Sequence, residues 1–125
     1  NIGMMVCYDL RFPELALHLR GQGANILTAP SAFTYTTGQM HWQLLLQARA
    51  MDTQCTVLGA AQQGWHGEKR QTWGHAAAAN SRGQLLDMVH AEGAQIFTVD
   101  FDLTEQAKVR ESMPLMQHRK LLQFS

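Results

Sequence analysis

The chain has 125 residues, enough for one domain with a hydrophobic core, and 46% of them are hydrophobic. Ten basic residues balance ten acidic ones, so neither nucleic acid nor an anionic membrane surface is an expected partner. The apolar runs are too short to span a bilayer. The two cysteines, Cys7 and Cys55, lie far apart without a CxxC pair, which indicates a reducing, cytoplasmic compartment.

The first half of the chain alternates predicted strands and helices. Residues 2–7 (IGMMVC) form an apolar run typical of a strand covered on both faces. Pro13 and Glu14 then begin a helix that stops near Gly21, because proline and an acidic residue both suit a first helical turn. A strand at 24–33, an irregular polar and aromatic loop at 33–39, and a helix at 39–52 with Trp42, Leu45, Leu46 and Arg49 on one face are predicted next.

The second half is predicted to consist mostly of short strands. A strand at 54–62 leads into a glycine-bounded loop at 64–74, and turn signals then separate strands at 75–80, 85–90 and 94–101. Asp102 and Glu105 suggest a capping box for a last helix that ends near Met113, before Pro114. The remaining tail is basic and amphipathic. The alternation predicts an α/β fold with a mixed sheet, in one domain without repeats or linkers.

Cys7 is the candidate nucleophile because it lies where the first strand gives way to a polar turn. A sulfur at such an elbow is presented beside unpaired backbone N–H groups, and the amide of Tyr8 is then placed to help hold a developing oxyanion. Buried cysteines are also common in ordinary cores, so the spacing alone leaves a packing role open.

The residues around Cys7 allow several arrangements. Asp9 and Arg11 are interpreted as an ion pair that fixes the turn, in preference to direct catalysis. Among the six histidines, His41 and His75 lie near loop ends and are the best candidates to line a pocket. No histidine pair has metal-binding spacing, so no metal site is expected. Phe33, Tyr35 and Thr36 follow a strand end, where open α/β sheets commonly bind ligands.

Four stretches resemble one family when taken in order. They are CYDLRFPEL, APSAFTYTTGQMHWQLLLQARAMDTQC, AAQQGWHGEKRQTWGH and MPLMQHR, and they cover nearly the whole chain. Together they are similar to the nitrilase superfamily of carbon–nitrogen hydrolases, in particular to its Nit branch, which includes deaminated glutathione amidase and omega-amidase.

The resemblance implies half of an α-β-β-α sandwich and a cofactor-independent amidase. In the family a cysteine, here Cys7, attacks the carbonyl carbon of a small carboxamide, and ammonia and a carboxylic acid are released. Phe33, Tyr35, Thr36 and His41 are then expected to bind the substrate, which the loop sequences suggest is of the deaminated glutathione type. The resemblance also implies a homodimer or a higher even-numbered assembly, with the helix of Trp42 near the interface and the C-terminal tail reaching a partner.

The family's catalytic glutamates and lysine lie upstream of the cysteine, so residues 1–125 are expected to be the C-terminal part of the domain and inactive alone. Gln43, Ala76 and the pair Ser81-Arg82 depart from the family pattern and leave the substrate assignment open. Two alternatives remain: a pseudoenzyme or assembly module of the same fold, and a small Cys–His hydrolase that uses His41 or His75.

Overall fold

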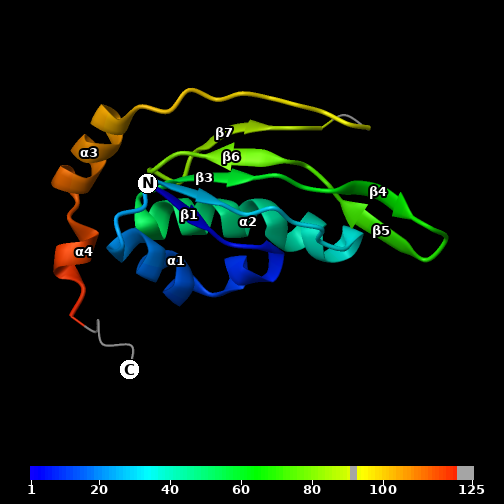
Figure 1. Cartoon of the computed structure of the whole chain (residues 1–125), viewed down its shortest axis with the longest axis horizontal. Coiled ribbons are helices and arrows are strands. Elements are labelled where there is room, and N and C mark those ends of the chain that lie inside the picture. Colours follow the sequence, from blue (N-terminus) through cyan, green and yellow to red (C-terminus); the bar gives the residue numbers. More distant parts are fainter. Residues whose placement is uncertain (91–92, 121–125) are drawn as a thin grey trace.

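The computed structural model describes residues 1–90 and 93–120 and contains a mixed five-stranded sheet (Figure 1). The first three strands in this sheet are parallel and the last two are antiparallel to their neighbours. In spatial order the strands are β1 (Ile2–Met4), β2 (Ile26–Thr28), β3 (Thr56–Gly59), β6 (Ala77–Ala79) and β7 (Leu85–Met88). The predicted α/β class with a mixed sheet is therefore confirmed.

Two helices cover one face of this sheet, α1 (Pro13–Gly21) and α2 (Tyr35–Thr53) (Figure 1). Helix α1 has the bounds that its proline start predicts. On α2 the face with Trp42 and Leu46 turns inward, and both side chains are almost fully buried against strand residues such as Leu27 and Val57. This apolar face of α2 is thus part of the chain's own core.

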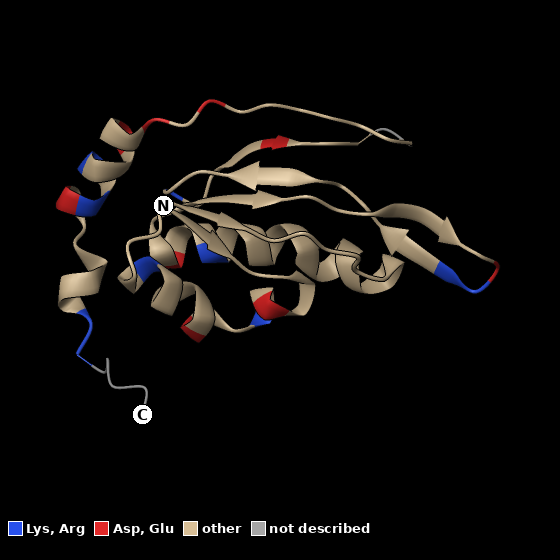
Figure 2. Cartoon of the chain, viewed as in Figure 1, with Lys and Arg blue, Asp and Glu red and all other residues tan. Residues whose placement is uncertain are grey.

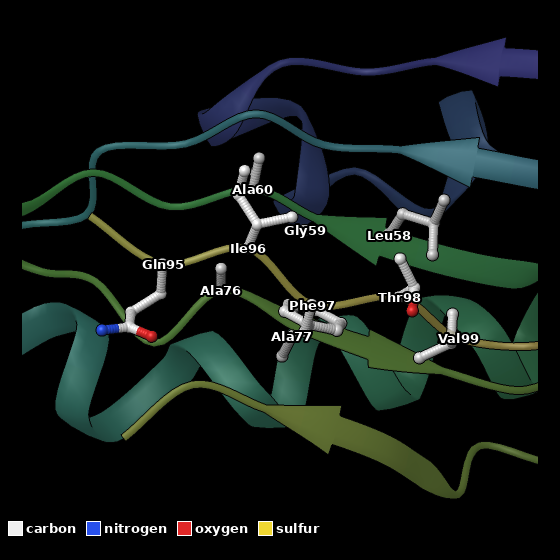
Figure 3. A pocket seen from close by; sticks show the side chains of 10 residues that line it. All are labelled: Leu58, Gly59, Ala60, Ala76, Ala77, Gln95, Ile96, Phe97, Thr98 and Val99. Atoms are coloured by element: carbon white, nitrogen blue, oxygen red, sulfur yellow. The ribbon is translucent and has the colours of Figure 1, made fainter. Parts of the chain in front are cut away.

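The opposite face of the sheet is crossed by an extended segment, residues 95–99. Figure 3 shows Ile96, Phe97 and Thr98 lying over β3 and β6, and an apolar pocket of about 430 Å³ lies between them. The predicted strand at 94–101 is wrong, because these residues run as an extended segment that is not part of a strand. Apolar alternation favours a strand, but backbone pairing also requires a free sheet edge at the right place.

Two further predictions about the middle of the chain are corrected. Residues 35–39 of the predicted loop form the first turn of α2. Gly38, which lies in this turn, is buried against the Trp73 side chain. Most of the predicted loop at 64–74 belongs to an antiparallel hairpin of β4 (Gln63–His66) and β5 (Arg70–Trp73). Charged residues of both signs lie at its turn (Figure 2). Glycine was interpreted as a loop signal, whereas here it permits the hairpin's positive φ angles, as at Gly67.

The C-terminal helices α3 (Leu103–Ser112) and α4 (Leu115–His118) pack at one end of the sheet (Figure 1). The Asp102 carboxylate accepts hydrogen bonds from the Thr104 and Glu105 amides, which confirms the N-cap half of the predicted capping box. The Glu105 carboxylate accepts a hydrogen bond from Lys108 at 2.6 Å. Arg110 on α3 donates to Asn25 Oδ1 at 2.8 Å and to the Gln54 carbonyl at 3.2 Å. Burial at this junction lowers the pKa of the Arg110 guanidinium. The last five residues of the predicted tail lie outside the described part.

Candidate active site

The candidate site lies where three parallel strands end together. Strands β1, β2 and β3 point the same way, so the residues that follow them meet at one edge of the sheet. Cys7 follows β1, Ser31 follows β2 and Gln62 follows β3, and all three line one pocket of about 580 Å³. This is the edge at which open parallel sheets bind ligands.

A strained backbone presents Cys7 to this pocket. Its φ of 46° places it in the left-handed region, which a residue with a side chain adopts only where the surroundings impose it. Cys7 also begins a short 3-10 helix, η1 (Cys7–Arg11), and its amide donates to the Pro30 carbonyl at 2.9 Å. Strand β1 therefore ends at Met4, earlier than the strand predicted over residues 2–7, and the chain turns sharply at Cys7.

Asp9 holds this elbow through hydrogen bonds. Its carboxylate accepts from the Val6 amide at 2.8 Å, and its own amide donates to the Val6 carbonyl at 2.9 Å. The predicted Asp9–Arg11 ion pair is not among the contacts of the described residues. Arg11 Nη2 instead lies 3.3 Å from His41 Nδ1, and the guanidinium forms cation–π contacts with the Tyr8 and Phe33 rings. Asp9 thus fixes the backbone, while Arg11 links η1 to α2.

The pocket around Cys7 is lined by small and neutral side chains with one cationic exception. Its walls come from the three strand ends and from the hairpin, namely Val6, Cys7, Pro30, Ser31, Ala32, Ala60, Ala61, Gln62 and Arg70. Of these lining residues, the sequence predicts only Cys7 as a site residue. The order of the strands and the position of the hairpin bring these residues together. Neither can be recognised from the sequence around Ser31 or Ala61.

The other predicted site residues do not line this pocket. Phe33 is 8% exposed and packs edge-on against Trp42, so within this chain it belongs to the core. Tyr35 and Thr36 lie exposed in the first turn of α2, and the half-buried His41 follows one turn later. The Tyr8 side chain is 65% exposed. Its amide follows Cys7 directly in the elbow.

His75, the second candidate base, packs against Trp73 and does not line the Cys7 pocket. Its ring stacks on Trp73 with centroids 4.0 Å apart, and its Nδ1 lies 2.7 Å from the Trp73 carbonyl. Neither it nor His41 lines the cysteine's pocket. Within residues 1–90 and 93–120, no three His, Cys, Asp or Glu side chains group in a way that would hold a metal ion. None of the described helices is both long and apolar enough to cross a membrane.

Comparison with known proteins places this geometry in a family. The sequence profile described as carbon-nitrogen hydrolase matches residues 1–111. The chain belongs to the carbon–nitrogen hydrolase family. A deaminated glutathione amidase from Yersinia enterocolitica is 44% identical over 122 residues, which are 98% of this chain and 42% of that protein. The predicted family is therefore confirmed.

Two solved structures support the fold. The NitFhit protein of C. elegans superposes with a TM-score of 0.87 at 41% identity, over 96% of this chain and 29% of that one. A mutant of the amidase from Nesterenkonia sp. superposes with a TM-score of 0.63 at 28% identity, over 70% of this chain and 33% of that one. That structure shows covalent addition of the acetamide moiety of fluoroacetamide at its active-site cysteine. The chain spans less than half the length of these carbon–nitrogen hydrolase relatives.

Proposed function

We propose that the parent protein is an amidase that hydrolyses a carbon–nitrogen bond of a small carboxamide, with Cys7 as its nucleophile. The observation that carries this proposal is the strained elbow, which places the Cys7 sulfur at the carboxyl edge of the parallel strands. Family membership supports the reaction class, and amidase-named relatives support a substrate of the deaminated glutathione type. The free thiols of Cys7 and Cys55 are consistent with a reducing cytoplasm.

The proposed chemistry has two steps. The Cys7 thiolate forms a C–S bond with the amide carbonyl carbon, and the oxyanion is held by the Tyr8 amide and by a cation. The C–N bond then breaks, and the nitrogen leaves after taking a proton. Water attacks the resulting thioester and releases the carboxylic acid, which regenerates the thiol. The general-base glutamate, the lysine and the supporting glutamate that the family resemblance implies would come from the rest of the parent domain.

The decisive experiment replaces each cysteine of the chain in the full-length parent protein. Cys7→Ser and Cys7→Ala are expected to abolish ammonia release from a small carboxamide, whereas Cys55→Ala is expected to retain it. Cys55 is a matched control because its fully buried thiol donates to the Ala24 carbonyl, away from the pocket. Turnover that survives the loss of Cys7 would overturn the assignment.

A second candidate is a folded pseudoenzyme or assembly module. It would keep the fold of this chain without the three catalytic residues that the family resemblance implies outside it. The parent sequence outside this chain separates the two candidates, because an amidase needs one glutamate, one lysine and a further glutamate there. Predicted substrate contacts at Phe33, Tyr35, Thr36 and His41 belong to the amidase proposal.

A further inference from the structure

A second polar pocket lies at the other end of β3 from Cys7. Its volume is about 240 Å³, and it lies between the start of β3, the turn before β7 and the first turns of α3. We call it the α3 pocket, and its polar lining includes Thr56, Ser81, Arg82, Asp100, Glu105 and Gln106. Thr56 begins β3, whereas the Cys7 pocket is lined by residues beyond the end of that strand. A ligand of the α3 pocket is therefore not the proposed amide substrate.

Gln106 on α3 contributes a buried acceptor without a donor to the wall of this pocket. The residue is 2% exposed, and its Nε2 donates to the Asn25 carbonyl at 2.9 Å. This bond fixes the amide, so Oε1 is the end that is turned away from Asn25. Within residues 1–90 and 93–120, Oε1 has no hydrogen-bond partner although it is buried. Because a buried carbonyl without a donor costs free energy, this oxygen indicates a missing donor.

Two hydroxyl groups in the same lining are also uncommitted. Thr56 and Ser81 are 4% and 8% exposed, and both line the α3 pocket. In the part of the chain that the structure describes, neither hydroxyl takes part in a side-chain hydrogen bond. Each hydroxyl oxygen can accept a hydrogen bond from a ligand. Together with Gln106 Oε1, they give the pocket three acceptors on three different elements.

The charge of the lining favours a cation. Three carboxylates, those of Asp100, Asp102 and Glu105, line the pocket with one guanidinium, that of Arg82. The Asp102 carboxylate caps α3, and that of Glu105 pairs with Lys108 at 2.6 Å. Among the described residues Asp100 and Arg82 form no ion pair. Asp100 is therefore the carboxylate that is available to a ligand.

We propose that the α3 pocket binds an alkyl cation that carries several N–H donors, a guanidinium or an ammonium group. Its donors meet Asp100, the two hydroxyls and Gln106 Oε1, and charge-assisted hydrogen bonds of this kind are the strong ones. The alkyl part lies against Leu86 and Phe101 in the same lining. Two sources can supply this chemistry, a free small molecule or an arginine or lysine side chain from the rest of the parent protein. The inference does not depend on the proposed amidase function.

Calorimetric titration of the full-length parent with two probes of similar shape tests the proposal. n-Butylguanidinium is charged and n-butylurea is neutral, and the cation is expected to bind at least about tenfold more tightly. Asp100→Asn should weaken binding of the cation at least about tenfold, and Thr56→Val should weaken it severalfold. Arg82→Gln should strengthen it, because a like charge is removed from the lining. Asp87→Asn is the matched control, since Asp87 is an exposed aspartate outside the pocket.

A second measurement separates the two sources of the cation. If a side chain of the parent fills the pocket, neither wild type nor Arg82→Gln binds the probe. In the Arg82→Gln background, Asp100→Asn should then lower the urea midpoint of unfolding, whereas Asp87→Asn should not. Equal binding of the two probes would overturn the inference, as would absence of binding with equal stability of the two aspartate variants. Binding that requires Arg82→Gln would overturn it too, because Arg82 would then fill the pocket itself.

Discussion

Cys7 and Asp9 form the smallest unit on which the proposed activity depends. The positive φ of Cys7 is unfavourable for any residue other than glycine and must be maintained by its neighbours. The Asp9 carboxylate supplies such support, because it accepts a hydrogen bond from the amide of Val6, the residue before the cysteine. This contact lies within the elbow that carries the sulfur.

Asp9→Ala in the parent protein is expected to lower activity more than stability. The lost hydrogen bond should cost about 1 kcal/mol of unfolding free energy, since the Val6 amide can bond to water instead. The elbow then samples other conformations, so kcat should fall at least about tenfold, because misplacing a reacting atom is costly. Urea unfolding and steady-state kinetics measure the two effects.

Asp87→Ala is the control for this substitution. Asp87 is an exposed aspartate on β7 that accepts a hydrogen bond from the next amide in the chain, well away from Cys7. It should change neither stability nor kcat appreciably. Equal losses of kcat in the two variants would contradict a special role for Asp9.

At the scale of elements, the contact between α2 and β5 determines where the hairpin lies. Gly38 on α2 faces Trp73 so closely that an added Cβ would lie 2.2 Å from the Trp73 Cβ. Such a separation is impossible without movement of the helix or the hairpin. Because the Trp73 amide is bonded to the Phe33 carbonyl, the strand cannot move without losing that bond.

Gly38→Ala is therefore expected to destabilise the parent by about 1–3 kcal/mol, although alanine favours helix by up to about 1 kcal/mol. Gly21→Ala on α1 is the matched control, because nothing lies within 4 Å of its added Cβ. The control should be neutral or slightly stabilising. Urea denaturation of both variants measures the difference in unfolding free energy. Equal stability would show that α2 and the hairpin can move apart at little energetic cost.

The sequence predicted the elements whose signals are local. Pro13 marks the start of α1 and Asp102 the start of α3, because proline and an N-cap side chain act within one turn. The start of α2 at Tyr35 was missed, since Thr34 makes no side-chain cap and the first turn is polar and aromatic. Its helical state depends on packing against Trp73, which is distant in sequence.

The difference between local signals and contacts that are distant in sequence also explains which residues of the candidate site were predicted. Cys7 was predicted because a thiol at a strand end is visible in the sequence. Ser31, Gln62 and Arg70 were not, because they reach the pocket through the order β1-β2-β3 and through the hairpin. The residues predicted from the loop after β2 instead contribute to the core, as Phe33 does, or lie exposed on α2.

For the whole molecule, the chain by itself is expected to be inactive and prone to association. Strands β1 and β7 are sheet edges, and apolar side chains such as Ile2 and Ile96 are 64% and 95% exposed. The base and the cation are expected elsewhere in the parent, and each is worth orders of magnitude in rate. An ammonia assay and light scattering on the isolated 125 residues test this. A monomeric, active chain would contradict the proposed mechanism.

The parent protein is expected to form a homodimer or a higher even-numbered assembly through the outer side of α2. Trp42 is 1% exposed and is part of the core, so it does not itself face a partner. Met40, Leu44 and Met51 are 59%, 67% and 55% exposed, and their spacing places them along one side of the helix. A symmetric pairing of this side would bury apolar surface on both subunits at once.

Sedimentation of the full-length protein at micromolar concentration measures this association. Leu44→Glu is expected to shift the protein towards monomer, because it puts two charges into a symmetric apolar contact. Gln43→Glu is the matched control, since it adds the same charge one residue away, at a position where the Nit pattern usually has glutamate. Deleting residues 115–125 tests the predicted contribution of the C-terminal tail. A wild-type protein that sediments as a monomer, with neither Leu44→Glu nor the deletion changing its behaviour, would rule out both the pairing through α2 and the role of the tail.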